Sequence, residues 1–297
     1  MFIISMGAGL GNQMFEYAFY THLKMLYPLV KIKVDTEFAF PKAHNGIEIF
    51  DIFGVSAEKA TKAEVLCLTS GYGLNGDEFK CSNIVEKIWK KLKGTFTAVP
   101  HTMKIQDDFT EYYEDFFDIE DGQSVYFLGP FANYHYFSSI QNEIKNIYKF
   151  PIIEDERNKC YASMIENCDS ISIHVRKGDY SSEGIELTSP LFYNHAISEI
   201  EKKVEDAKYF VFTDDVVYAK KIFPDEESYV VVEGNTGKNS FRDMQLMSMC
   251  KHNITANSTF SFWGAFLNSN PNKIVIAPNL AFTGSKYPFV CDEWILI

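Results

Sequence analysis

The second half of the chain alternates short apolar runs with segments of helical pattern, and this alternation constrains the fold more than any other feature. The apolar runs that we expect to form strands are residues 171–175, 209–212, 229–232, 253–255 and 273–276. Helical segments separate them, at residues 190–203, from 216, at 240–250 and up to 267. Short runs rich in Val, Ile and Phe are typical of parallel strands covered on both faces. The pattern therefore predicts a doubly wound α/β domain that binds ligands beyond the carboxyl ends of its strands.

The first residues begin a similar pattern. Residues 2–6 read as a strand, a glycine-rich turn follows, and residues 11–26 read as a helix that leads to a second strand at 30–34. Strand, helix and strand in this order are the start of a βαβ unit. Two Rossmann-type domains are therefore predicted.

The boundary between these domains is placed near residue 153. Residues 133–148 have the apolar spacing of a helix, which Pro151 ends, and an acidic, polar run follows it. We therefore predict an N-terminal domain of residues 1–153 and a C-terminal domain of residues 154–297. The pattern within residues 40–125 is mixed and supports no firm prediction.

Composition excludes several classes of function. The net charge of −12 argues against nucleic-acid binding, which needs a basic surface. The six cysteines include no C-x-x-C pair and have no histidine cluster beside them, so ordinary thiols are expected and no metal site is predicted. The chain has no run of about 18 apolar residues and no signal sequence at its start, which favours a cytoplasmic protein. Peripheral contact with the inner membrane stays open, because weak surface association needs no such signal.

The glycine-rich turn after the first predicted strand is a candidate binding site. It contains Gly9, Gly11, Asn12 and Gln13. Glycines let the backbone approach a ligand, and the following helix start offers free N–H groups to phosphate oxygens. The amides of Asn12 and Gln13 are well placed to bond hydroxyl or phosphate oxygens.

An NAD-linked sugar-nucleotide oxidoreductase is one alternative reading of this region. Asp35, at the end of the second predicted strand, resembles an acid that binds a ribose. The fingerprint G-x-G-x-x-G is incomplete, however, because Asn12 or Met14 stands where the third glycine belongs.

A second candidate site follows the predicted strand at 171–175. His174 and Arg176 are two residues apart and so share a face. The planar guanidinium of Arg176 can bind a diphosphate through two hydrogen bonds. The structural alternative is a salt bridge between Arg176 and Asp179, with His174 in the core. The pair at a strand end, in an acidic chain, favours the phosphate site.

Three further groups of polar residues follow predicted strands or begin helices. Asp214 is a candidate ligand residue, whereas the adjacent Asp215 is better explained as a helix cap. Asp243 lies on a predicted helix, and a carboxylate can accept two hydrogen bonds from guanine. The residues from 257 to 260 are Asn257, Ser258, Thr259 and Phe260, which could cap a helix or hold phosphate oxygens.

Taken together and in order, these motifs resemble the bacterial-type α-1,2-fucosyltransferases of glycosyltransferase family 11. The resemblance rests on Gly9-Leu10-Gly11-Asn12-Gln13-Met14-Phe15, residues 129–137, His174-Val175-Arg176-Lys177-Gly178-Asp179-Tyr180, residues 210–215, Asp243 and residues 257–268. It implies a GT-B-like fold, in which the two domains face a cleft, and an inverting enzyme without a metal or cofactor. The implied donor is GDP-fucose. The implied acceptor is the 2-hydroxyl of a terminal β-galactoside, in glycan or lipopolysaccharide O-antigen synthesis.

The resemblance also implies roles for individual residues. Arg176 would stabilise the departing diphosphate, with His174 supporting it, and Asp243 would read guanine. The remaining implied donor-binding residues are Gly9, Gly11, Asn12, Gln13, Asp214, Asn257, Ser258, Thr259 and Phe260. Asp179 is the candidate catalytic base.

Two positions depart from the family pattern. Lys177 replaces the second arginine of the usual Arg-Arg pair, so that position keeps its charge but loses the forked geometry. Phe262-Trp263 replaces the usual double tryptophan, which we interpret as a tolerated packing change. A non-catalytic glycan-binding protein is the other alternative, because the chain is acidic and rich in aromatic residues.

Overall fold

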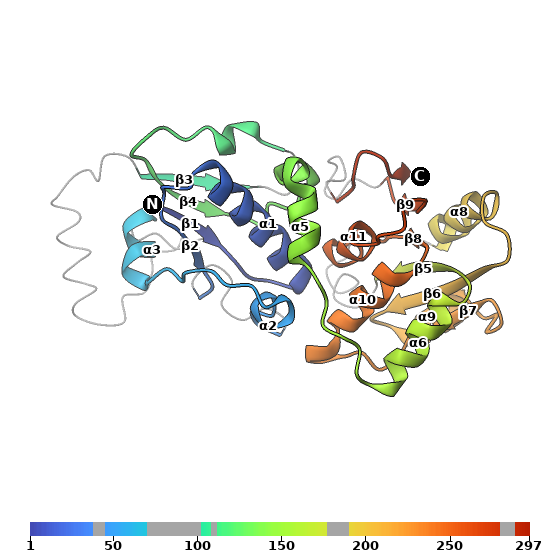
Figure 1. The fold of residues 1–297 in the computed structure, drawn as a ribbon. Coiled ribbons are helices and arrows are strands. Elements are labelled where there is room, and N and C mark those ends of the chain that lie inside the picture. The colour runs from blue at the N-terminus through green and yellow to red at the C-terminus, as the bar shows by residue number, and fades with distance from the viewer. Residues whose placement is uncertain (38–44, 70–101, 108–111, 177–189, 280–288) are drawn as a thin grey trace. The chain divides into compact units, whose positions relative to one another are not determined.

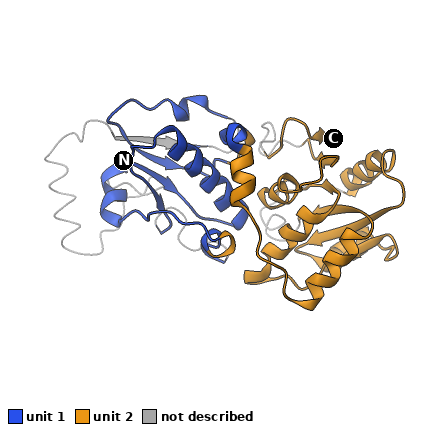
Figure 2. Ribbon diagram, in the orientation of Figure 1, with its two compact units in different colours: residues 1–50, 54–131, 135–140 blue, residues 51–53, 132–134, 141–297 orange. Residues whose placement is uncertain are grey.

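A computed structural model describes residues 1–37, 45–69, 102–107, 112–176, 190–279 and 289–297, with the backbone alone for 102–106 (Figure 1). The chain divides into two compact units (Figure 2). Unit 1 comprises Met1–Phe50, Gly54–Phe131 and His135–Ile140, and unit 2 comprises Asp51–Phe53, Ala132–Tyr134 and Gln141–Ile297. Each unit has its own parallel sheet, which confirms the predicted class of two Rossmann-type α/β domains.

The sheet of unit 1 has the order β2-β1-β4-β3. Its strands are β1 (Phe2–Ser5), β2 (Ile32–Asp35), β3 (Thr102–Gln106) and β4 (Ser124–Leu128), and every neighbouring pair is parallel. Its helices are α1 (Leu10–Leu26), α3 (Lys62–Leu68), η1 (Glu114–Phe117) and η3 (Ser138–Ile140), whereas α2 (Ile49–Phe53) and η2 (Tyr134–Tyr136) are divided between the two units.

Helices cover both faces of this first sheet. Ile3 and Tyr126 pack against Val65 in α3, whereas the ring of Phe127 contacts that of Phe19 in α1, at a centroid distance of 5.2 Å. Neighbouring positions of a strand point to opposite faces, so Tyr126 and Phe127 reach different helices. The β1-α1-β2 order matches the βαβ unit that the sequence predicts.

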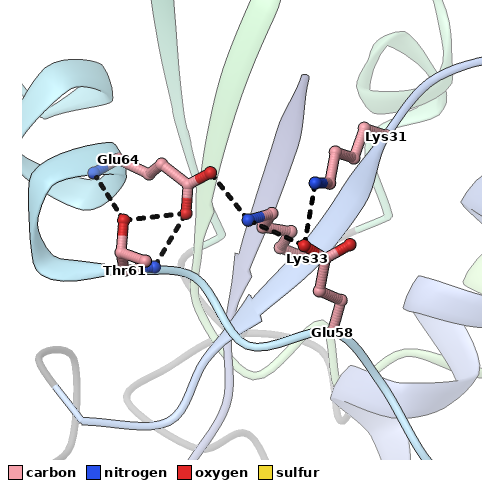
Figure 3. A network of polar contacts seen from close by, with 5 residues as sticks. All are labelled: Lys31, Lys33, Glu58, Thr61 and Glu64. Carbon is pink, nitrogen blue, oxygen red and sulfur yellow. Dashed lines mark hydrogen bonds and ion pairs between the residues drawn. The ribbon is translucent and has the colours of Figure 1, made fainter.

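A charged network fastens α3 to the edge strand β2 (Figure 3). Lys33 is only 4% exposed, and its Nζ contacts Glu64 at 2.6 Å and Glu58 at 2.9 Å. Thr61 caps α3, and Glu64 bonds back to the Thr61 backbone N–H, which completes a capping box. These contacts lower the pKa of Glu64 to about 2, and the hydrogen bond with Lys33 has the largest effect.

We expect Glu64→Gln to lower the stability of the protein at pH 7 by about 1 kcal/mol, a value typical of a good ion pair that is partly exposed. Gln keeps the capping box but removes the charge that faces Lys33. A carboxyl whose pKa is depressed in the folded state stabilises that state above pH 4.5 and stops doing so as the pH falls toward 2. The difference between variant and parent, measured by urea unfolding, should therefore disappear over this range.

The matched control for this prediction is Glu156→Gln. Glu156 pairs with Lys159 at 2.7 Å, but its side chain is 90% exposed, so we expect a smaller effect. An equal loss in both variants, or a difference that does not change with pH, would contradict the role assigned to Glu64.

The sheet of unit 2 has the order β10-β9-β8-β5-β6-β7, again with parallel pairs throughout. Its strands are β5 (Asp169–Val175), β6 (Ala207–Thr213), β7 (Tyr229–Val231), β8 (His252–Ile254), β9 (Val275–Ala277) and β10 (Ile295–Leu296). Its helices are α5 (Gln141–Ile147), α6 (Glu156–Glu166), α8 (Pro190–Glu201), α9 (Val216–Ile222), η4 (Gly237–Asn239), α10 (Phe241–Met249) and α11 (Thr259–Phe266).

Strand β6 shows why four consecutive residues of this second sheet, 209–212, are apolar. Tyr209 and Val211 belong to a core with residues of α8 and α9, whereas Phe210 and Phe212 belong to a second core with residues of α6 and α10. A strand covered on both faces is typically a near-continuous apolar run. The doubly wound arrangement predicted for the second half is therefore confirmed.

The change from unit 1 to unit 2 falls earlier in the chain than residue 153. It follows Ile140, and α5 belongs to unit 2. Within that unit, Lys145 of α5 lies 4.9 Å from the ring centre of Phe266, and Tyr148 meets Trp263 edge to face at 5.1 Å. Contacts with α11, which the helical pattern of residues 133–148 does not reveal, thus attach α5 to the second unit.

Candidate functional site

The carboxyl edge of the second sheet gathers most of the predicted site residues. Arg176 directly follows β5, Asp214 directly follows β6, and Asn257 stands three residues after β8. These strands are neighbours in the order β8-β5-β6 and are parallel, so their ends meet at one edge. Ligands of doubly wound domains bind at this edge.

Arg176 and Asp214 form an ion pair at this edge. Nε of Arg176 lies 3.2 Å from Oδ2 of Asp214, and the two side chains are 22% and 25% exposed. The register of the sheet explains the contact, because Val175 lies opposite Thr213. The alternative partner, Asp179, and the adjacent Lys177 lie outside the described residues. Asp214 was predicted to bind the donor, and the structure shows it as a carboxylate that holds Arg176 at the strand end.

His174, two residues before Arg176 on β5, is buried and senses the charges of this pair. It is 5% exposed, and its ring lies 5.9 Å from that of Phe260, centre to centre. Burial, followed by the charge of Arg176, lowers the pKa of His174 to about 3, so the imidazole is neutral at physiological pH. Its Nδ1 is buried without a hydrogen-bond partner among the described residues.

A second orphaned atom lies at the start of α11. Asn257 is 2% exposed, and its Oδ1 has no hydrogen-bond partner in the described part of the chain. Ser258 is the N-cap of α11, and its Oγ accepts a hydrogen bond from the Phe260 N–H at 3.2 Å. Thr259 and Phe260 form the first turn and are partly exposed. Buried polar atoms normally have partners, so these two unpaired atoms near a helix N-terminus indicate a place for a polar ligand. Asn257 Oδ1 needs a donor such as a hydroxyl, whereas the N–H groups of the helix start suit anionic oxygens.

Asp243 lies in the first turn of α10, which also begins at the carboxyl edge because helices of this fold run antiparallel to the strands. Burial raises the pKa of Asp243 to about 7, against a hydrogen bond from Asn235 that lowers it. Asn235 Nδ2 donates to Asp243 Oδ1 at 2.8 Å. The neighbouring prediction for Asp215 is confirmed, since it caps α9 by accepting from the Tyr218 N–H at 2.9 Å.

The glycine-rich turn lies in unit 1, between β1 and α1. Gly9 is the N-cap of α1 with an extended backbone, and the residue that adopts positive φ is Ala8, at 55°. Gly11 is buried in the first turn, and Asn12 is partly buried. The turn therefore has the predicted place at a strand end, although its glycines are not needed for left-handed geometry.

Gln13 differs from its prediction as a donor-binding residue. Its Nε2 donates to the carbonyls of Ala8 and Gly46, at 2.9 and 2.8 Å, and its Oε1 accepts from the N–H groups of Glu48 and Ile49. These four bonds use the whole hydrogen-bonding capacity of the amide. Gln13 thus joins the glycine turn to the segment before α2, and this arrangement does not support a donor contact.

Two buried acids were missed or misread in the sequence. Glu16 is 1% exposed, and its carboxylate accepts from the Gly7 N–H at 2.8 Å. Its position on the buried face of α1 was the available signal. Asp35, the acid considered for a ribose, is also 1% exposed and accepts from the Tyr126 hydroxyl at 2.7 Å. The burial of Asp35 counts against the NAD-linked alternative.

In the described residues, no helix is both long enough and apolar enough to cross a membrane. In the same residues, no group of three or more His, Cys, Asp or Glu is arranged to hold a metal ion.

Comparison with known proteins gives a family match over most of the chain. The model of glycosyl transferase family 11 matches residues 81–295. The O-antigen biosynthesis glycosyltransferase WbnK of Escherichia coli is 39% identical over 158 residues, which cover 49% of this chain and 52% of that protein. An α-1,2-colitosyltransferase of Escherichia coli is 35% identical over 164 residues, 52% of this chain and 55% of that protein. The matches thus span about half the length of these relatives.

Solved structures give more distant matches. A crystal structure of the α-1,6-fucosyltransferase NodZ soaked with GDP-fucose has a TM-score of 0.47 at 13% identity, covering 91% of this chain and 96% of that chain. The structure of POFUT1 in complex with GDP-fucose has a TM-score of 0.49 at 12% identity, covering 93% and 97%.

Proposed function

Because this chain belongs to glycosyl transferase family 11, we propose that it transfers L-fucose from GDP-fucose to the 2-hydroxyl of a terminal β-galactoside. The main observation that supports a donor site is the group of residues at the carboxyl edge of the second sheet. There the cation of Arg176 accompanies two buried orphans, His174 Nδ1 and Asn257 Oδ1. A nucleotide sugar offers both the anionic oxygens and the hydroxyl groups that such a site needs. The α-1,2 linkage and the O-antigen acceptor are carried over from the names of the two relatives.

The proposed mechanism depends on stabilising charge. Departure of GDP builds negative charge on the diphosphate and oxocarbenium character on fucose, and no general acid is needed for so good a leaving group. Arg176 would offset that charge together with the N–H groups at the start of α11. His174 is neutral, so its Nδ1 can donate a hydrogen bond to a phosphate oxygen without adding a proton to it.

The acceptor hydroxyl would attack from the face opposite GDP. A β-linked donor then gives an α-linked product, with inversion at the anomeric carbon. The hydroxyl proton needs an acceptor, and Asp179 is our candidate for this base. We propose that the reaction needs no metal ion, because Arg176 and the helix start meet the electrostatic demand.

The test is an assay with GDP-fucose and a panel of galactosides, with the product linkage determined by NMR. We expect an α-1,2-fucosylated galactoside, formed at the same rate in excess EDTA. A fucosylated product of another linkage would refute the acceptor assignment, and a loss of activity with EDTA would refute metal independence. If the enzyme transfers a different sugar from its GDP donor, the donor assignment fails while the glycosyl transfer stands.

A further inference from the structure

Four side chains form a continuous hydrogen-bonded row that ends at Asp243. Asp155 Oδ2 accepts from Asn158 Nδ2 at 3.0 Å, and Asn158 and Asn235 bond each other in both directions, at 2.8 and 2.9 Å. Asn235 Nδ2 then donates to Asp243 Oδ1 at 2.8 Å. Asn158 is 2% exposed and Asn235 8% exposed, so water does not compete for these bonds.

The orientation of each amide in this row is determined by its neighbours. A carboxylate accepts and does not donate, so the NH₂ group of Asn158 faces Asp155 and that of Asn235 faces Asp243. Both hydrogens of Asn235 Nδ2 and its Oδ1 are then in use. Rotation of the Asn235 amide would break three bonds at once, which makes it a rigid support for one oxygen of Asp243.

The charged groups around Asp243 favour its ionised form only weakly. Arg157 of α6 acts on it from a distance, and the guanidinium of Arg157 is held by the Gly234 carbonyl at 3.0 Å. Asp155 lies at the far end of the row. On α10 itself, Arg242 is turned to the carbonyls of Pro151 and Ile152, at 2.8 and 3.1 Å. Within the described part of the chain, the side-chain hydrogen bond that Asp243 accepts comes from Asn235.

We propose that Asn235, supported by Asn158, is a positioning residue that holds the Asp243 carboxylate in the orientation needed to read guanine. This inference rests on the proposed function, in which Asp243 accepts the two parallel N–H groups of the guanine Watson–Crick edge. The two guanine N–H groups can bond both oxygens of the carboxylate only if the carboxylate plane is held in one orientation. The hydrogen bond from Asn235 to Asp243 Oδ1 holds it there. The hydrogen bond from Asn235 also favours the ionised form of Asp243, which is the form that accepts the guanine N–H groups.

The test is the affinity for GDP from pH 5.5 to 9, measured by calorimetry on the full chain. In the parent protein, affinity should rise with pH and level off above about 7, as Asp243 ionises. Asn235→Asp replaces a donor with a like charge, so the midpoint should move up by about one pH unit, with an affinity about fivefold lower at pH 7. Asn158→Ser leaves the Asn235 bond but removes its support, so we expect a smaller shift in the same direction.

The matched control is Asn167→Asp, at the other end of α6. Asn167 is exposed and its amide donates to Ser163 of the same helix, so the same charge change there should leave the midpoint in place. A merely structural role for Asn235 would lower the affinity equally at every pH, and that result would overturn the proposal. If Asn235→Asp fails to fold, Asn158→Ser provides the test instead. An unchanged midpoint in that variant would also overturn the proposal.

A second readout separates this inference from the proposed function. Carbon-13 NMR of the Asp243 carboxyl follows its titration without any nucleotide. If the parent protein binds no GDP, the proposed function fails, but an upward shift of this titration in Asn235→Asp still supports the coupling of the two residues. If GDP binds and the Asp243 titration is the same in both proteins, the positioning role fails alone.

Discussion

Replacing Arg176 with alanine should lower the rate of transfer by about 100- to 1,000-fold, the loss typical of removing one preorganised group that faces developing charge. Arg176 directly follows β5, and its Nε lies 3.2 Å from Asp214. The side chain is 22% exposed, so its removal leaves no large cavity in a core. We therefore expect a folded protein, with an unchanged circular dichroism spectrum, that releases GDP slowly from the donor.

Two companion variants separate catalysis from structure at this position. Arg176→Lys keeps the charge but loses the planar fork, so its activity should fall between those of the parent and the alanine variant. Asp214→Asn removes the charge that holds Arg176 and should cost less than Arg176→Ala. If the arginine serves only the ion pair, both alanine and asparagine variants will show the same modest loss, and the leaving-group role is then wrong.

The second large effect concerns Asp243. We expect Asp243→Asn to weaken GDP binding about 100-fold, because the amide offers a donor where guanine presents two of its own, and hydrogen bonds to a charged acceptor are strong. The loss should shrink when inosine diphosphate replaces GDP, since inosine lacks the exocyclic amino group. Calorimetry with both nucleotides measures the two effects.

The pH dependence of this site follows from the raised pKa of Asp243, about 7. GDP needs the ionised carboxylate, so its affinity should fall about tenfold for each pH unit below this value. The stability of the free protein depends on pH in the opposite direction. Folded protein binds this proton more tightly than unfolded protein, so the contribution of Asp243 is complete below pH 3.8 and is lost as the pH rises through 7. Asp243→Asn should therefore be more stable than the parent at pH 8 although it binds GDP less well.

The control for Asp243 is Asp169→Asn, at the opposite end of β5. Asp169 is exposed and pairs with Lys251 at 2.6 Å, so its change should alter neither nucleotide affinity nor the pH profile. Equal affinity of Asp243→Asn for GDP and inosine diphosphate, with no loss from the parent, would remove this residue from the guanine site.

The sequence predicts the architecture well because its signals are local. Short apolar runs that alternate with helical patterns produce β5 to β9 and the helices between them, and the polar residues that follow those runs fall at the carboxyl edge. The residues at a strand end are those that directly follow an apolar run in the sequence, so they can be identified without knowing the tertiary structure. The pattern of apolar runs is therefore enough to select His174, Arg176, Asp214 and Asn257 as residues of that edge.

What the sequence by itself determined is thus the two α/β domains and the set of residues at the edge of the second sheet. Only the tertiary structure decided which partner each of those residues has. Arg176 contacts Asp214 because of the β5–β6 register. The side-chain amide of Gln13 forms hydrogen bonds with residues up to 36 positions away, and Asn235 bonds Asn158, which is 77 positions away. The reason is physical: hydrogen bonds and desolvation depend on which segments pack together, and no local pattern records a contact between residues so far apart.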